Sequence, residues 1–523
     1  MLTELRTMRQ DSLNRPERSI PDAVLYWWLP LAYTLCFCAC STLQVFFFDV
    51  NDWDFSYFLT QPWRIAQGWD AAVPFADSVS VDVFWAHHLT GLGFLLAPLF
   101  RIFPSPYTLA LLHACACGLT AFALPRLVRQ IYADFAPAQD RESRLRWSAL
   151  CLLVIFFFFQ PYLGAFRYAT HYTTLVSPLT FWAVLWLHQR RMTRFWLCCC
   201  VICLAQERAV VTVCCLGMYA FLLLGERRLG VALCALSCLL FFGAVKVALP
   251  WLREWAGCAD TGYAFQNGLA PLAMLPEKGR FLAVCLLCTL GLPLCGRRAA
   301  AAALCALPLL AMALVSNREG MFDFWHHYHD IAAVFLLCAM AYGLLRLQER
   351  LPARHWKRLF ALGTLVYCVA HVASPYQASQ PVVRSAMLLT LPHADELRRL
   401  NDDIRVFDNL PEHVALYVQS GLGPRLSLHK NRYLACATAI KQAAAHVSLM
   451  ALSPLCGQYE LGGSYAEIAA MADAAPGLTL LADTGRLRIY ASERLCAEAP
   501  GVAAGLRRSL EPRRHLPPAS SWP

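Results

Sequence analysis

The chain has 523 residues, of which 58% are hydrophobic and 15% are charged, and its formal net charge is +10. A mean hydropathy of +0.44 excludes an ordinary soluble globule and indicates a protein that crosses a membrane many times, because apolar runs of ~20 residues recur along it. The positive charge sits in arginine-rich loops, which indicates cytoplasmic loops rather than nucleic-acid binding. Most of the 24 cysteines lie inside apolar runs, where a thiol packs as a small hydrophobic group, so no disulfide framework is expected.

The chain is predicted to enter the membrane from the cytoplasm. Residues 1–22 form the predicted cytoplasmic N-terminus, because several arginines precede the first apolar run at about 23–48. Residues 49–106 are predicted to form the first periplasmic loop, since the part up to Asp82 holds six aspartates and only one basic residue, Arg64.

Two segments of this loop are predicted to be helices that lie at the membrane surface without crossing it. Residues 55–65 carry apolar side chains at helical spacing, as in an amphipathic surface helix. Residues 88–103 form a short apolar run that is interrupted by Gly91, Gly93 and Pro98, which indicates an interfacial or re-entrant helix.

The later basic loops are all cytoplasmic only if the chain crosses the membrane about eleven times. The transmembrane domain is accordingly predicted to cover residues 23–375, and an odd number of crossings leaves the rest of the chain in the periplasm. The spans expected after the first loop are roughly 107–125, 147–163, 173–188, 195–206, 209–224, 229–250, 281–295, 299–315, 331–345 and 359–373.

Residues 376–500 have the composition of a small periplasmic α/β domain, and residues 501–523 are expected to be a tail rich in proline and arginine. The absence of a Walker A loop and of a GxGxxG motif argues against a nucleotide-driven pump. The elements expected in the domain are a helix at 395–408 and strands at 413–418, 447–452, 478–481 and 487–490, with a turn around Asp483-Thr484-Gly485.

The strongly polar clusters all follow odd-numbered crossings, whereas the arginine-rich loops follow even-numbered ones. This segregation predicts a polar site at the periplasmic face. The residues concerned are Asp52, Asp54, His88, Arg167, His171, Glu207, Arg208, His326, His327, Tyr328, His329 and Asp330.

Two of these residues lie in the first periplasmic loop. Asp54 is either a solvated residue that caps a helix or a carboxylate at the membrane edge that can take a proton or hold a metal. His88 is either an interfacial polar group or a functional residue that acts as a hydrogen-bond donor or as a ligand.

The next pair lies between two predicted spans. Arg167 and His171 either anchor the membrane interface through their polar and aromatic neighbours or form part of a binding site. In a binding site, the planar guanidinium group of Arg167 suits a phosphate.

Glu207 and Arg208 interrupt two short apolar spans. Placing two ionisable residues there is costly unless they face a polar cavity, so a functional role is favoured over a structural one. Glu207 could orient a substrate hydroxyl or a ligand, and Arg208 could bind a phosphate.

The densest polar cluster spans residues 326–330. His326 and His329 could meet on one helical face and bind a divalent metal with Asp330, although this spacing is not specific. The alternative is an interfacial belt of histidine and aromatic side chains. No cofactor is otherwise indicated.

Several short stretches in this order resemble the bacterial family of predicted membrane proteins of domain of unknown function 2079. That family is similar to the C-type (GT-C) superfamily of integral-membrane glycosyltransferases. The matching stretches are Asp54-Phe55-Ser56-Tyr57 to Trp63, His88 to Phe100, Phe103-Pro104-Ser105-Pro106, His171 to Pro178, Gln206-Glu207-Arg208, His327-Tyr328, and Leu410-Pro411 to Leu428-His429.

The resemblance implies a GT-C-like helical membrane protein with interfacial helices in its first external loop and a lipid-phosphate sugar donor. It also implies a catalytic carboxylate at the start of that loop, which Asp54 matches by position. The expected function is inverting transfer of a sugar from polyprenyl phosphate to a periplasmic or cell-envelope acceptor, in the bacterial cytoplasmic membrane.

In this interpretation Asp54 and Glu207 are the catalytic candidates. A transporter or flippase of a lipid-linked intermediate and a non-catalytic membrane scaffold are the alternatives, but no internal repeat supports transport. The expected substrate-binding residues are Asp52, His88, Arg167, His171, Arg208, His327 and Tyr328, and the candidate metal ligands are His326, His329 and Asp330.

Overall fold

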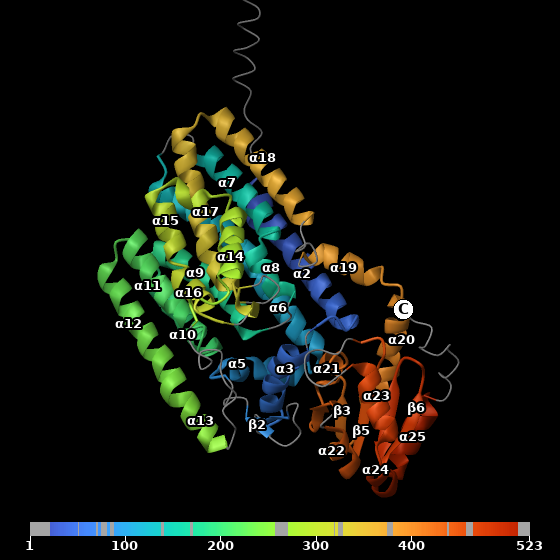
Figure 1. The fold of residues 1–523 in the computed structure, drawn as a ribbon. Coiled ribbons are helices and arrows are strands. Elements are labelled where there is room, and N and C mark those ends of the chain that lie inside the picture. The colour runs from blue at the N-terminus through green and yellow to red at the C-terminus, as the bar shows by residue number, and fades with distance from the viewer. Residues whose placement is uncertain are drawn as a thin grey trace, which may run out of the picture.

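The computed structural model has a large helical part that is followed by a smaller part built on a five-stranded sheet (Figure 1). This agrees with the expected mostly helical membrane protein with a small C-terminal α/β domain. The structure describes residues 21–50, 52–68, 72–74, 81–83, 88–137, 141–167, 171–256, 270–317, 319–322, 328–373, 380–436, 439–456 and 464–510.

The helical part begins with a π-helical turn and continues almost entirely as α-helices. Its elements are η1 (Val24–Trp28), α2 (Leu29–Phe46), α3 (Asp52–Ala66), β1 (Ala72–Pro74), β2 (Val81–Val83), α5 (Leu92–Ile102), α6 (Pro106–Phe135), α7 (Arg141–Phe157), α8 (Gln160–Arg167), η2 (Tyr172–Leu175), α9 (Val176–His188), α10 (Met192–Ala205), α11 (Val211–Leu223), α12 (Arg227–Gly243), η3 (Ala244–Ala248), α13 (Leu249–Ala256), α14 (Leu275–Cys288), η4 (Leu292–Cys295), α15 (Arg297–Leu304), α16 (Leu307–Leu314), η5 (Glu319–Met321), α17 (Asp330–Arg350) and α18 (Ala353–Val372).

By length and composition, four described helical stretches can cross a membrane: Val24–Phe46, Pro106–Phe135, Arg227–Trp255 and Asp330–Arg350. Two bent pairs could each make one more span, namely α7 with α8 and α15 with α16. Helices α10 and α11 are apolar but shorter than a full span. The expected number of about eleven crossings therefore stays a prediction.

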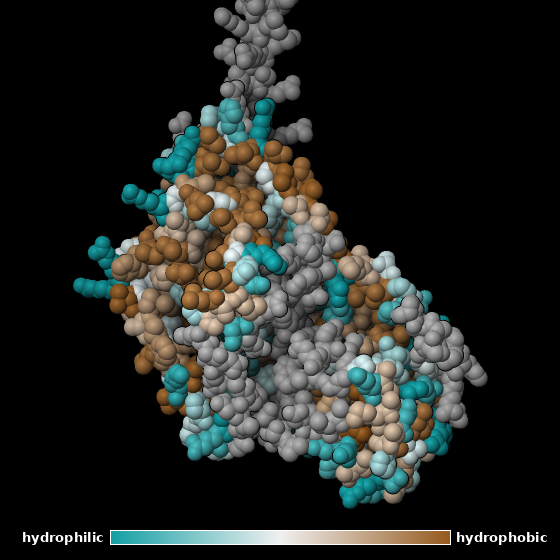
Figure 2. Space-filling view, in the orientation of Figure 1, coloured by the Kyte–Doolittle hydropathy of each residue, from teal (hydrophilic) through white to brown (hydrophobic). Residues whose placement is uncertain are grey.

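Helix α17 is the central helix of this part, and the continuous α12–η3–α13 rod lies at its edge (Figure 1). In α17, 89% of the most apolar stretch is buried, against 17% for Arg227–Trp255. On the face that Figure 2 shows, the described surface of the helical part is largely hydrophobic, as required of a surface that faces lipid chains.

The segment that the sequence predicts as the first external loop contains the two short helices expected there. Helix α3 packs against α5, and the two helices lie at the end of the bundle beside the C-terminal domain (Figure 1). Strands β1 and β2 form a small antiparallel pair between the helices. Helix α5 is only 11 residues long, too short to span a bilayer, which agrees with an interfacial helix.

The C-terminal domain is entered through α19 and contains a sheet of order β4-β3-β5-β7-β6. Its elements are α19 (Pro381–Leu389), α20 (Ala394–Asp403), η7 (Ile404–Phe407), β3 (Ala415–Val418), α21 (Gly423–Leu426), β4 (Arg432–Leu434), α22 (Ala439–Ala445), β5 (Ser448–Leu452), α23 (Tyr465–Ala474), β6 (Leu478–Asp483), β7 (Arg488–Ser492), α24 (Glu493–Glu498) and α25 (Pro500–Leu510).

The sheet is mixed and is covered on both faces. Strand β3 pairs in parallel with β4 and β5, whereas β7 is antiparallel to β5 and β6. Alternate residues enter two separate hydrophobic cores: Leu416 and Leu449 contribute to one, and Tyr417 and Met450 to the other. The domain therefore has its own core on each face of the sheet.

The four expected strands match β3, β5, β6 and β7, whereas β4 was not predicted. The boundary at residue 500 needs correction, because residues 500–510 belong to the domain as helix α25. Ala503, Leu506 and Leu510 recur at helical spacing and are buried in the core. Cys456 and Cys496 are both free thiols.

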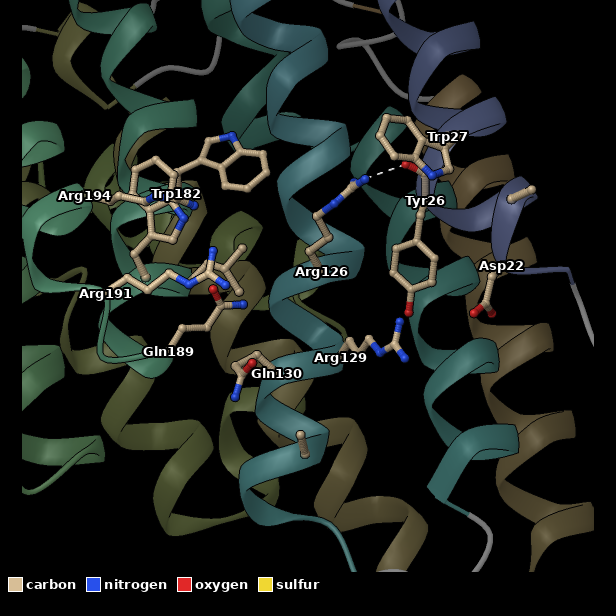
Figure 3. Close-up of a pocket in the computed structure, with 14 residues that line it drawn as sticks. Asp22, Tyr26, Trp27, Arg126, Arg129, Gln130, Trp182, Gln189, Arg191 and Arg194 are labelled. Atoms are coloured by element: carbon tan, nitrogen blue, oxygen red, sulfur yellow. Dashed lines mark hydrogen bonds between the residues drawn. The ribbon is translucent and has the colours of Figure 1, made fainter.

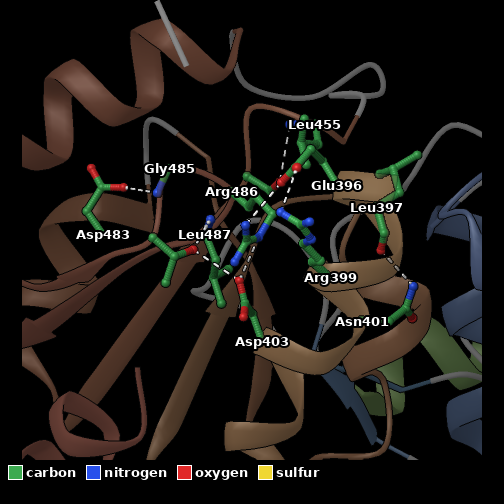
Figure 4. Close-up of polar contacts among 12 residues, drawn as sticks. Glu396, Leu397, Arg399, Asn401, Asp403, Leu455, Asp483, Gly485, Arg486 and Leu487 are labelled. Atoms are coloured by element: carbon green, nitrogen blue, oxygen red, sulfur yellow. Dashed lines mark hydrogen bonds and ion pairs between the residues drawn. The ribbon is translucent and has the colours of Figure 1, made fainter. Parts of the chain in front are cut away.

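A buried arginine joins the start of this domain to its last hairpin (Figure 4). Arg486 donates from Nε to Asp403 Oδ2 at 3.1 Å and from Nη1 to Glu396 Oε2 at 3.0 Å. The Arg486 side chain is only 6% exposed. Thr484 Oγ1 donates to the same Asp403 oxygen at 3.1 Å. Helix α20 is thereby fixed to the β6–β7 turn.

We expect Arg486→Gln to lower the free energy of unfolding of the C-terminal domain by about 3 kcal/mol, because it leaves the buried Asp403 carboxylate without the guanidinium group of Arg486. The control is Arg398→Gln, which removes an exposed pair with Asp395 and should change stability by under about 0.5 kcal/mol. Amide exchange of the β5 and β7 strands in the full-length protein measures both effects. Equal shifts in the two variants would contradict this role of Arg486.

Candidate functional site

Glu207, at the break between α10 and α11, contacts the residues just before α5, in the segment predicted as the first external loop. The residue is 2% exposed. Its Oε2 accepts the Leu89 N–H at 2.9 Å, and its Oε1 lies 3.1 Å from His88 Nδ1. The Gln206 side chain also contacts the His88 ring. One buried carboxylate therefore fixes both the backbone and the imidazole at the start of the α5 segment.

Backbone contacts next to Glu207 hold the same two segments together. The Gly91 N–H donates to the Leu204 carbonyl at 2.8 Å, and Thr90 Oγ1 donates to the same carbonyl at 3.0 Å. A Cβ at Gly91 would lie 2.9 Å from Leu204 Cδ2, and a Cβ at Gly93 would lie 2.4 Å from Gln61 Oε1. Glycine at these two positions lets α5 approach α10 and α3.

Two histidines and the aromatic side chain of Phe58 pack together beside Glu207. The Phe58 ring centroid lies 4.2 Å from that of His171 and 6.1 Å from that of His88. The two imidazole centroids are 6.1 Å apart. His171 is fixed through Nδ1, which lies 2.8 Å from Thr173 Oγ1. Residues from α3, the start of α5 and the start of η2 thus meet in one place.

Arg208 faces the start of α17. Its Nη2 donates to the Tyr328 carbonyl at 3.1 Å, and its guanidinium carbon lies 4.6 Å from the centre of the Tyr328 ring. Within the described residues, no carboxylate lies within ion-pair distance of Arg208. The guanidinium charge is positioned by a carbonyl and an aromatic ring and keeps its capacity for an anion.

The other members of the 326–330 cluster that the structure describes have different surroundings. The His329 ring packs on Phe281 with centroids 4.5 Å apart. Asp330 accepts a hydrogen bond from Ser177 Oγ at 2.8 Å through Oδ2, and its buried Oδ1 has no partner among the described residues. The described residues contain no group of three histidine, cysteine or acidic side chains that could hold a metal. His326 and His327 lie outside the described residues.

Three further predicted residues are placed by their backbone alone. Asp52 and Asp54 lie in the first turn of α3, and Asp54 precedes Phe58 by about one helical turn. Arg167 is the last residue of α8. Their side chains lie outside the described part, so their roles stay predictions.

Several polar residues next to the site were not predicted. Gln61 is fully buried on α3 and accepts the Tyr172 hydroxyl at 3.0 Å. His113 is buried on α6, and its Nδ1 lies 2.8 Å from Thr174 Oγ1. Ser177 holds Asp330. For His113, its place as a single polar residue inside an apolar run was the signal that could have found it, since such a residue needs a buried partner.

The C-terminal domain packs against the end of α2, just before α3, and forms hydrogen bonds with it. Phe47 and Phe48 lie in the hydrophobic core of the domain, and Phe48 has a left-handed backbone with φ of 57°. Asp49 forms an ion pair with Arg384 of α19, with Arg384 Nε 2.6 Å from Asp49 Oδ2. Asn401 Nδ2 donates to the Phe46 carbonyl at 2.7 Å.

Helix α3 is also bonded to the C-terminal domain along its length. Ser427 Oγ donates to Ser56 Oγ at 2.6 Å, and Arg64 Nη1 donates to the Lys430 carbonyl at 2.9 Å. Both serines and Arg64 are buried. The helix that carries Asp54 therefore lies between the bundle and the C-terminal domain.

A cleft of about 460 Å³ opens at this junction. Arg425 hydrogen-bonds to the Tyr107 hydroxyl, and burial lowers the pKa of Arg425. Burial also lowers the pKa of His429, and neither ring nitrogen has a hydrogen-bond partner among the described residues. The lining includes Trp63, Pro104, Ser105, Pro106, Tyr107, Asp408, Glu412, Arg425, His429 and Lys430.

Comparison with known proteins places this arrangement in a family. A family model described as predicted membrane protein (DUF2079) matches residues 45–448, which include the helical part from the end of α2 onward and the first strands of the C-terminal sheet. The chain belongs to this family. The family match confirms the resemblance inferred from the short motifs.

No curated protein matches this DUF2079 chain. Two crystal structures of ArnT from Cupriavidus metallidurans are similar to it. The structure bound to undecaprenyl phosphate has a TM-score of 0.48 and 12% identity. The match covers 90% of this chain and 98% of the ArnT chain. The apo structure has a TM-score of 0.48 and 11% identity. The match covers 88% of this chain and 98% of the ArnT chain. Neither likeness assigns an activity to the DUF2079 protein.

Removing the Glu207 carboxylate should release the start of the α5 segment. We expect Glu207→Ala to speed amide exchange at residues 88–91 by ten- to a hundred-fold, because a hydrogen bond to a charged group contributes about 1.5–3 kcal/mol. Glu207→Gln keeps an acceptor and should have a smaller effect. Exchange mass spectrometry of the protein in nanodiscs measures the difference.

The matched control is Glu226→Ala, which removes an ion pair with Arg190 at the far end of α11. This control should leave the exchange of residues 88–91 unchanged. Unaltered exchange in Glu207→Ala, or equal acceleration in both variants, would show that Glu207 does not hold this segment.

Proposed function

We propose that this protein is an integral-membrane glycosyltransferase that moves a sugar from a polyprenyl-phosphate donor to a periplasmic or cell-envelope acceptor. The proposal rests on the resemblance of its motifs to C-type glycosyltransferases and on one feature of the site, the guanidinium group of Arg208. Arg208 is fixed in position but has no carboxylate partner among the described residues. Such a group suits a lipid phosphate.

In the proposed step, the acceptor attacks the anomeric carbon of the donor sugar from the face opposite the phosphate. The new bond joins the acceptor oxygen or nitrogen to this carbon, and the bond from the carbon to the phosphate oxygen breaks. The electron pair leaves with the polyprenyl phosphate, whose charge Arg208 stabilises together with Arg167. The anomeric configuration is thereby inverted.

Asp54 is the proposed general base, which takes the proton of the acceptor. It lies about one turn before Phe58, the residue that packs against His171 and His88. The carboxylate of Asp54 would then act at the end of the bundle where α3, α5 and η2 meet.

Glu207, which the sequence analysis grouped with the catalytic residues, is better suited to positioning. Both carboxylate oxygens are engaged, one by the Leu89 N–H and one beside His88 Nδ1. A carboxylate held in this way orients the imidazole of His88 toward the site. Asp330 Oδ1 has no partner among the described residues and is a candidate acceptor for a sugar hydroxyl.

The cleft at the domain junction is the proposed place for the acceptor. Its basic residues Arg425 and Lys430 are matched by Asp408 and Glu412, so the formal charge is balanced. Trp63 and Tyr107 add aromatic faces. A neutral polyhydroxylated group fits such a lining better than a strongly charged one.

We expect Asp54→Asn to reduce transfer by at least a hundred-fold without unfolding the protein, because general-base catalysis contributes about 10²–10⁴-fold. Arg208→Gln should mainly raise the KM for the donor, and Arg208→Lys should recover part of the loss. The measurement is release of undecaprenyl phosphate from a panel of synthetic undecaprenyl-phosphate sugars by purified protein in nanodiscs, followed by mass spectrometry.

The control is Asp395→Asn, at an exposed position of the C-terminal domain. It should retain full turnover, and size-exclusion profiles check that each variant is folded. Undiminished turnover in Asp54→Asn would remove Asp54 from the mechanism. No donor consumption by the unaltered protein across the panel would contradict the proposed function.

A further inference from the structure

A second cleft lies at the end of the helical part that is far from the candidate site, and we call it the basic cleft. It has a volume of about 730 Å³ and lies between η1, the C-terminal third of α6 and the turn from α9 to α10 (Figure 3). Its basic residues are Arg126, Arg129, Arg191 and Arg194, and its aromatic residues are Tyr26, Trp27, Trp182 and Trp186.

The chain path fixes where this cleft lies relative to the candidate site. Helix α9 begins next to His171 and ends at the basic cleft, and α10 begins at the cleft and ends just before Glu207. At 1.5 Å per residue each of these helices is ~20 Å long. The two sites therefore lie at opposite ends of these two helices.

The charge of the basic cleft is not balanced by its own lining. Asp22 is its only acidic residue, and Asp22 Oδ1 already lies 3.2 Å from Arg146 Nη2. Within the described part of the chain, none of the four cleft arginines has a carboxylate within ion-pair distance. The cleft thus presents a strong positive potential to any ligand.

The arginines are held by aromatic rings and carbonyls instead. Arg126 donates to the carbonyls of Tyr26 and Phe122 at 3.1 and 2.7 Å, and its guanidinium carbon lies 4.8 Å from the Trp27 ring centre. Arg129 lies over Tyr26 at 5.6 Å. Figure 3 shows Arg191 projecting toward the α6 residues from the opposite wall. An anion between these walls would meet guanidinium groups from both sides.

An apolar strip leads away from the mouth of the cleft. Trp27 and Leu35 are 60% and 61% exposed, and Leu31, between them, is 40% exposed. These residues recur at helical spacing along η1 and α2, so they form one face that points to lipid. Tryptophan beside such a strip is typical of the membrane interface.

We propose that the basic cleft binds the phosphate headgroup of an anionic phospholipid, whose acyl chains lie along the apolar face of η1 and α2. In the orientation that the sequence predicts, this lipid belongs to the cytoplasmic leaflet. Basic pockets between transmembrane helices commonly hold anionic headgroups at that face. The volume of the cleft is in the range of small-molecule sites.

Arginines that only set the membrane topology need not gather around a cavity. Arg227 and Arg228 show this arrangement: they are exposed at the start of α12, at the end of α11 that is far from the candidate site, and line none of the clefts described above. They carry the same charge as a cleft pair and provide the matched control.

The test is native mass spectrometry of the full-length protein titrated with phosphatidylglycerol or with phosphatidylcholine of the same acyl chains. We expect phosphatidylglycerol to bind at least ten-fold more tightly. Arg129→Gln/Arg191→Gln should weaken its binding by about thirty-fold, and Arg227→Gln/Arg228→Gln by no more than about two-fold. Arg129 and Arg191 are both exposed, so their substitution should not disturb folding.

Three results would overturn the proposal. One is equal weakening by both double variants, which would indicate a general surface charge effect. Another is the absence of a headgroup preference in the unaltered protein. The third is displacement of phosphatidylglycerol by inorganic phosphate at equal concentration, which would indicate a site for the free anion rather than for a lipid.

Discussion

The burial of one carboxylate between two helices organises the site of this protein. Glu207 lies at the break between α10 and α11, where water is excluded, and a charged group there is stable only if its oxygens are bonded. Leu89 and His88 supply these contacts from the first external loop. The start of α5 must therefore sit against the break, which in turn brings His88 to His171 and Phe58. The proposed chemistry depends on this arrangement.

A second constraint comes from the C-terminal domain. This domain is hydrogen-bonded to the end of α2 and to α3, in addition to its covalent connection to the bundle. Phe48 and Asp49 fix the end of α2, and Ser427 and Lys430 fix α3. The family match runs from residue 45 to 448, across the junction and into β5. Both observations indicate that the helical part and the start of the sheet form one functional unit.

Much of this organisation was predictable from the sequence, for definite physical reasons. Apolar runs and arginine-rich loops predicted a helical membrane protein, and a short run interrupted by glycines predicted the interfacial helix α5. His171, Glu207 and Arg208 were predicted as site residues because they are polar residues that interrupt apolar runs. Short runs rich in apolar residues predicted four of the five strands in the C-terminal sheet, and the Asp483-Thr484-Gly485 turn is present with Gly485 at positive φ.

The rest could not be predicted, because it depends on contacts between distant residues. Strand β4 has only three residues and pairs at the edge of the sheet, too short for a pattern to mark it. Helix α25 was assigned to the tail because the proline- and arginine-rich end dominated the composition. In the contact between Glu207 and Leu89 the donor is a backbone N–H. Every residue except proline has such a donor, so the residue types cannot indicate this partner. Gln61 and His113 were overlooked because their buried partners, Tyr172 and Thr174, lie far from them in the sequence.

The most direct test is an electron microscopy map of the protein in nanodiscs that contain undecaprenyl phosphate. We expect the Glu207 carboxylate within hydrogen-bond distance of the Leu89 N–H, and phosphate density against the Arg208 guanidinium group. A map in which residues 88–91 are separated from Glu207, or in which phosphate occupies only the basic cleft between η1, α6 and α9, would contradict the account.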